Sequence, residues 1–167
     1  AAPDMAIDRL LRFVATHEAV FERIDDSYDH VQTVYSDAIA AVGRLAGQLT
    51  SDVADTLPGR VATALQASSH GYYSEFASAI IPHLSPGGLK RWDGELKVEQ
   101  QQREAKEKTS KSRYGIPSSW EIRDIRKAIA DGLGDLDAVI ALEQQKPAAR
   151  QNSLDIAQRL LQAGRTE

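Results

Sequence analysis

The chain has 167 residues, a length typical of one compact domain that can bury a stable core without disulfides or a structural metal. Its composition is that of an ordinary globular protein, with 42% hydrophobic and 26% charged residues. The lack of cysteine excludes disulfides and cysteine-rich zinc sites, and the formal net charge of −4 argues against general affinity for nucleic acid.

The first half of the chain carries the clearest helical patterns. Pro3 and Asp4 suit a first turn, and they begin a predicted helix whose apolar positions recur at helical spacing. Another helix is predicted over residues 28–49, where one apolar face continues for about five turns. Its inward positions are Val31, Val34, Tyr35, Ala38, Val42, Leu45, Ala46 and Leu49.

Proline and glycine divide the segment that follows. Pro58-Gly59 interrupts the apolar pattern of residues 53–65, which predicts a kink or two short helices. A helix over residues 72–84 comes next, and we expect Pro82 to bend its last turn. Residues 85–88, Ser-Pro-Gly-Gly, predict a turn. Residues 100–117 are so polar that they bury little, and we expect this segment to project or to be mobile.

The second half ends in three predicted helices. Ser118 and Glu121 have the spacing of a capping box, which opens the first of them. Gly134 suits the left-handed position that ends it, and Asp135 suits the cap of the next helix. Pro147 is expected to open the last helix.

Helical periodicity without any strand-like alternation predicts an all-α fold. About eight helices joined by short turns favour antiparallel neighbours packed in sequence. We therefore expect an irregular right-handed α-solenoid, a helical-repeat-like array in which residues 1–167 form one helical domain of a longer protein.

Two segments resemble known families. Residues 154–167 resemble the first helix and turn of a tetratricopeptide-like repeat, with Ala157, Leu161 and Gly164 at its small, leucine and glycine positions. The tryptophan and tyrosine of that pattern are missing. Residues 13–27 resemble a bacterial family of uncharacterised helical proteins. That resemblance implies a helical fold and carries over no activity, cofactor or catalytic residue.

Two acidic clusters are candidate metal sites. His17 and Glu18 diverge by about 100° on a helix, and with Glu22 they do not have zinc-protease spacing, so structural roles are favoured. Residues 25–29 lack the glycine and terminal glutamate of a calcium loop, and helix capping is favoured there. The sequence predicts no metal and no cofactor.

Basic and aromatic residues suggest a partner surface. Residues 106–113 hold four basic side chains, a pattern that can contact phosphate but is usually just solvated. Aromatic anchors dominate partner surfaces, and adjacent tyrosines on one helix cannot both face inward, so we expect one of them to be exposed. The candidate surface comprises Tyr72, Tyr73, Trp92, Lys106, Lys108, Lys111 and Arg113.

No catalytic motif is recognisable in the sequence, neither a nucleophile elbow nor a phosphate-binding glycine pattern. The leading hypothesis is a non-catalytic helical scaffold or protein–protein interaction module, bound to another protein or to the rest of its own chain. The alternatives are a nucleic-acid-associated module that uses residues 90–113 and an enzyme with an unrecognised site. Without a signal peptide or a long apolar stretch, we expect a cytoplasmic protein with no membrane contact.

Overall fold

The computed structural model describes residues 2–23, 30–66, 71–109 and 118–165. Within these ranges every regular element is a helix, ten of them α-helices and two short 3-10 helices. The predicted all-α class is therefore confirmed. The chain groups into two compact units, residues 1–95 and 96–167, where the sequence predicted one domain.

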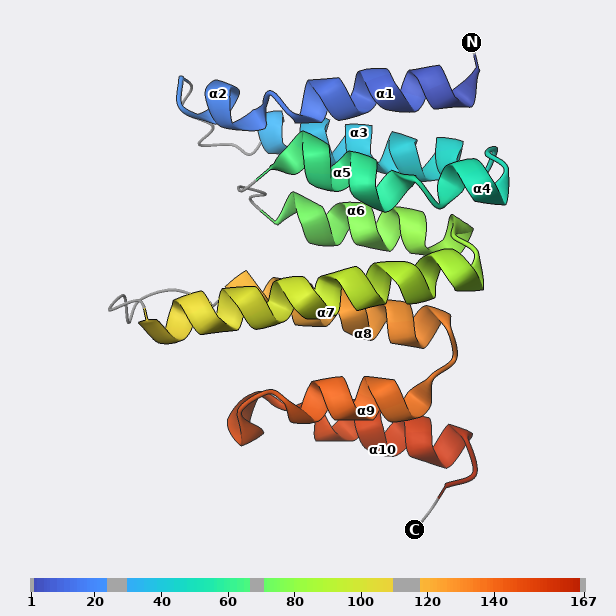
Figure 1. Cartoon of the computed structure of the whole chain (residues 1–167), viewed down its shortest axis with the longest axis vertical. Helices are drawn as coiled ribbons and strands as arrows, with labels where there is room; N and C mark the ends of the chain where they lie inside the picture. The colour runs from blue at the N-terminus through green and yellow to red at the C-terminus, as the bar shows by residue number, and fades with distance from the viewer. Residues whose placement is uncertain (1, 24–29, 67–70, 110–117, 166–167) are drawn as a thin grey trace. The chain divides into compact units, whose positions relative to one another are not determined.

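The first unit is built around four longer helices. Its elements are α1 (Pro3–Val14), α2 (His17–Phe21), α3 (His30–Ala46), α4 (Ser51–Ala54), α5 (Leu57–Leu65), α6 (Tyr72–Ile80), the 3-10 helix η1 (Ile81–His83) and the start of α7 (Pro86–Thr109). Helix α3 packs against α1 and α6, and α5 packs against the same two helices. Consecutive long helices run in opposite directions, so α3 and α6 run the same way (Figure 1).

Apolar burial holds the first unit together, as the periodicity predicts. Its fully buried side chains include Ile7, Val14, Val42, Leu57, Val61, Phe76 and Ile80. One predicted core position is wrong, because Val34 is 53% exposed. The buried face of α3 is centred on Tyr35, Ile39 and Val42, and this places Ile39 rather than Val34 in the core.

An aromatic cluster joins α1, α2, α3 and α6. His17 is buried, and its Nδ1–H donates to the backbone oxygen of Val14 over 2.9 Å. The imidazole packs edge-on against Tyr72, with ring centroids 5.4 Å apart, and Tyr35 stacks on Phe13 at 4.8 Å. The structure thus gives His17 the structural role that its sequence context favours over metal binding.

The breaks in the first unit follow its prolines. Residues 51–65 form two short helices, one of the two outcomes predicted, with Pro58 in the first turn of α5. Pro82 lies in η1, so the bend predicted at the end of the 72–84 helix is a change from α-helical to 3-10 geometry.

The turn predicted at residues 85–88 is wrong, because Pro86 is the first residue of α7. Ser85 caps that helix, since its hydroxyl oxygen accepts from the Gly88 N–H over 2.9 Å. The carboxylate of Asp55 in turn accepts from the Ser85 N–H at 2.9 Å and from its hydroxyl at 2.5 Å. A Cβ at Gly88 would collide with that carboxylate, which explains the glycine.

The second unit continues α7 and adds α8 (Ser118–Gly132), α9 (Leu136–Gln144), the 3-10 helix η2 (Ala148–Arg150) and α10 (Ser153–Gln162). Gly134 takes the predicted left-handed conformation, and the Asp135 side chain accepts from the Ala138 N–H. Pro147 precedes η2 rather than a long helix, and Asn152 caps α10 instead. Within the polar segment 100–117, residues 100–109 are helical, and 110–117 lie outside the described residues.

Helix α8 begins against a carboxylate from α7. The hydroxyls of Ser118 and Ser119 donate to Glu107 over 3.0 and 2.6 Å, and the Ser119 N–H donates to the same carboxylate over 2.9 Å. Burial works to raise the pKa of Glu107, but these hydrogen bonds outweigh it and lower the pKa below its ordinary value. The capping box predicted from Ser118 and Glu121 did not include this contact, in which a carboxylate from α7 accepts hydrogen bonds at the start of α8.

A buried glutamate joins α8, α9 and the start of α10. Glu143 is fully buried and accepts from the Lys127 ammonium at 2.7 Å and from the Asn152 N–H at 2.9 Å. Lys146 lies 3.0 Å from the same carboxylate. Burial alone would raise the pKa of Glu143, but these three partners lower it to about 2.

Candidate functional site

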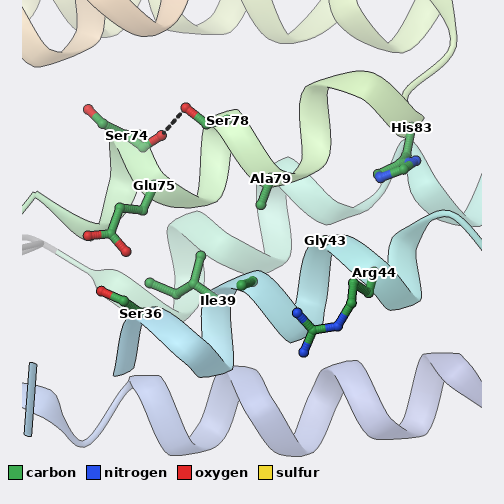
Figure 2. Close-up of a pocket in the computed structure, with 10 residues that line it drawn as sticks. Ser36, Ile39, Gly43, Arg44, Ser74, Glu75, Ser78, Ala79 and His83 are labelled. Atoms are coloured by element: carbon green, nitrogen blue, oxygen red, sulfur yellow. Dashed lines mark hydrogen bonds between the residues drawn. The ribbon is translucent and has the colours of Figure 1, made fainter. Parts of the chain in front are cut away.

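A groove of about 740 Å³ lies between α3 and α6 in the first unit. Helix α3 lines it with Ser36, Ile39, Ala40, Gly43 and Arg44. Helix α6 and η1 line it with Ser74, Glu75, Ser78, Ala79 and His83. Figure 2 shows where these residues lie along the two helices. The volume of the groove is within the usual range of ligand pockets.

Small residues form the floor of the groove. A Cβ placed on Gly43 would lie only 3.0 Å from both the Cβ and the backbone oxygen of Ala79, so the two helix backbones nearly touch there. At Gly47, just after the end of α3, a Cβ would lie 3.1 Å from the His83 ring, so that ring lies close to the backbone there. The Ser78 hydroxyl donates to the Ser74 backbone oxygen over 3.0 Å, which directs it toward its own helix (Figure 2).

The two ends of the groove carry opposite charges. Glu75 lies near Ser36 and Ser74 at one end, and Arg44 and His83 come from the other half of the groove, with the Arg44 guanidinium directed away from the His83 ring (Figure 2). Ala40 and Arg44 are exposed, whereas Glu75 and His83 are half-buried. The groove is therefore an accessible surface with small residues in the middle and an acid and a base at opposite ends.

The groove also contains the titratable side chains that the enzyme alternative requires. The enzyme alternative needs titratable side chains in one pocket, and Glu75 and His83 meet that condition. The two residues lie at opposite ends, however (Figure 2). The Ser78 hydroxyl donates to the backbone oxygen of Ser74 and not to either of these two side chains.

The aromatic residues of the predicted partner surface are buried. The expectation that Tyr72 or Tyr73 is exposed is wrong, because their exposed fractions are 1% and 7%. Adjacent positions on α6 are both covered, since Tyr72 packs against His17 and Tyr35 while Tyr73 packs against Trp92, itself 3% exposed. These three side chains therefore offer almost no area to a partner.

The basic residues of the predicted surface are only partly described. Lys106 and Lys108 are exposed on the last turns of α7, and Lys111 and Arg113 lie outside the described residues. Elsewhere on α7 Arg103 bonds to Glu99 one turn earlier, and Arg91 pairs with Asp55. The nucleic-acid alternative for residues 90–113 stays a prediction, and this pairing does not favour it.

No group of three or more histidine, aspartate or glutamate side chains is placed to hold a metal ion within the described ranges. The acidic segment 25–29 lies outside them. A polar pocket of about 370 Å³ in the second unit is lined by Gln100, Glu104, Arg126 and others. The Gln100 amide there is already bonded to Glu104, Gln145 and Arg126, which leaves little capacity for a ligand.

Comparison with known proteins gives a family without a function. The sequence matches a protein family of unknown function, DUF6880, over residues 1–167. The chain belongs to the DUF6880 family. No curated protein and no solved structure matches it. The resemblance to an uncharacterised family is thus confirmed, and the DUF6880 family supplies no activity or site residue.

The finding on membranes is separate. No helix in the portion of this DUF6880 chain that the structure describes combines the length and apolarity needed to cross a bilayer.

The sequence analysis did not predict the groove, although the spacing of two glycines indicates a close helix contact. Gly43 on α3 and Gly47 just after its end are four residues apart, a spacing that lets a second helix approach closely. Their neighbours Ala79 on α6 and His83 on η1 are also four residues apart. The sequence alone does not indicate that these two pairs meet, because about thirty-five residues separate them.

Proposed function

We propose that this chain is a non-catalytic helical scaffold that binds a short polypeptide segment of another protein in the α3–α6 groove. The observation that carries the proposal is an open groove with a small-residue floor and unlike charges at its two ends. Backbone amides and charged side chains of a polypeptide supply complementary groups for such a surface.

The helical-repeat interpretation is part of this proposal. It is supported by the way the pair α1 and α3 stacks on the pair α5 and α6, with α1 against α5 and α3 against α6. Repeat proteins stack helix pairs in this manner and use the resulting surface for binding. The likeness of residues 154–167 to a tetratricopeptide-like repeat is supported by α10 and by the left-handed Gly164 that follows it. A cytoplasmic location is supported by the cysteine-free composition.

Selection from a displayed library of random twelve-residue peptides tests the binding function. The selected peptides should bind wild-type protein and lose at least tenfold in affinity for Ala40→Trp, which fills the exposed middle of the groove. The matched control is Ala62→Trp, on an exposed position of α5 outside the groove, and it should bind as wild type does. Failure to select any peptide, or equal binding to both variants, would refute the proposal.

A further inference from the structure

Two charged side chains of the groove have no ion-pair partner among the described residues, in contrast to Arg60 on α5. Arg60 bonds to Asp4 over 2.7 Å and to Asp8 over 2.6 Å. Among the described residues neither Glu75 nor Arg44 forms an ion pair. Both line the same groove, so each is available to an incoming group of opposite charge.

The helix geometry sets the spacing between these charges. Ser36, beside Glu75, lies eight residues before Arg44 on α3, which corresponds to roughly 12 Å along the helix axis. An extended polypeptide covers that length in about four residues. Between the ends, the groove is lined by Ile39, Gly43 and Ala79, so this part of it carries no charge.

We infer that the groove selects a short extended segment carrying one cationic and one carboxylate side chain about four residues apart, the cation at Glu75 and the carboxylate at Arg44. The partner is therefore a polypeptide of mixed charge with small or apolar residues between the two ions. A purely acidic or purely basic tail meets repulsion at one end of the groove. This inference rests on the proposed function, since it specifies the partner of that same site.

The peptide selection, repeated on charge-reversed proteins, tests the inference. Wild-type protein should enrich peptides with Lys or Arg and Asp or Glu about four residues apart. Glu75→Lys should enrich peptides with two acids at that spacing, and Arg44→Glu should enrich peptides with two bases. A selected peptide should bind roughly two- to fivefold more tightly than the same peptide with one of its charged residues replaced by glutamine, as expected for an exposed ion pair. This gain in affinity should shrink at 0.5 M salt.

Two variants control for the net charge of the protein. Asp52→Lys on α4 and Arg9→Glu on α1 alter the charge by the same amounts at exposed positions outside the groove, and they should keep the wild-type preference. If the selected peptides lose affinity for Ala40→Trp but do not carry a cationic and an acidic residue about four positions apart, the inference is overturned and the proposed function still stands. If no peptide is sensitive to Ala40→Trp, the inference and the proposed function both fail.

Discussion

At the scale of single residues, the second unit depends on a buried carboxylate. Glu143 is fully buried between Lys127 and Lys146, and its pKa of about 2 means that folding favours its ionised form. The carboxylate therefore contributes stability at pH values above its ordinary pKa of about 4.5, and this contribution is lost as the pH falls toward 2. A shift of this size corresponds to about 3 kcal/mol.

We expect Glu143→Gln to lower the free energy of unfolding by about 2–3 kcal/mol at pH 7, because it leaves two ammonium groups facing a neutral amide. Urea unfolding at pH 7 and at pH 3 measures this free energy. The difference in free energy of unfolding between the variant and wild type should be smaller at pH 3. Glu99→Gln, in the more exposed pair with Arg103, is the matched control and should cost less than about 1 kcal/mol. Equal losses for the two variants would contradict this role of Glu143.

Arg123 is the residue for which the sequence offers least guidance. It is 4% exposed, and its guanidinium lies 5.2 Å from the centre of the Trp120 ring. Its Nε and one terminal nitrogen form no hydrogen bond within the described residues. Periodicity assigns charged residues to solvent, so the burial of Arg123, like that of Glu143, follows from tertiary contacts that no local pattern encodes.

At the scale of helices, the close approach of α3 and α6 makes a specific prediction. An alanine normally stabilises a helix by about 1 kcal/mol relative to glycine. At Gly43 the added Cβ presses on the backbone of Ala79, and we expect the variant to be destabilised by about 1–2 kcal/mol instead. Gly94→Ala is the matched control, because nothing lies within 4 Å of a Cβ there.

Thermal unfolding of the two variants should therefore shift in opposite directions from wild type. If Gly43→Ala is as stable as Gly94→Ala, the helices tolerate separation and the floor of the groove is not fixed by their contact.

The helices themselves were largely predictable, as were some of their ends, such as Pro3 in α1 and Asp135 before α9, but the start of α7 was not. Periodicity located α1, α3 and α8 because each presents one long apolar face. It misjudged the beginning of α7, since Ser-Pro-Gly-Gly is typical of turns. In the structure Asp55 fixes Ser85 as a cap, and a contact between residues thirty positions apart overrides the local preference. The groove was unpredictable for the same reason.

At the scale of the whole molecule, the two units are stabilised differently. Both units contain fully buried apolar side chains, such as Val42 in the first and Ile122 and Ile129 in the second, but α10 of the second unit has no buried residue and leaves Leu154 and Leu161 more than 65% exposed. Its Arg159 bonds to Asp131 on α8, and Arg165 bonds to Asp137 on α9. Exposed ion pairs therefore make a large part of the contacts between α10 and the helices α8 and α9.

Salt should therefore affect the units unequally. In 1 M sodium chloride, where screening acts over about 3 Å, we expect amide hydrogens of α10 to exchange roughly three- to tenfold faster, as the loss of two exposed pairs implies. Amides of α3 should be unaffected, since apolar burial does not weaken in this salt. Hydrogen exchange followed by mass spectrometry resolves the two helices, and an equal response of α3 and α10 would contradict the assignment.

The anchoring of Ser85 by Asp55 has a consequence for how the chain acquires its structure. The first turn of α7 contains two consecutive glycines, which give it little tendency to start a helix at that point. Its starting register is instead chosen by a carboxylate from the α4–α5 connection. The first turn of α7 can therefore form in its native register only after the α4–α5 connection has folded beside it.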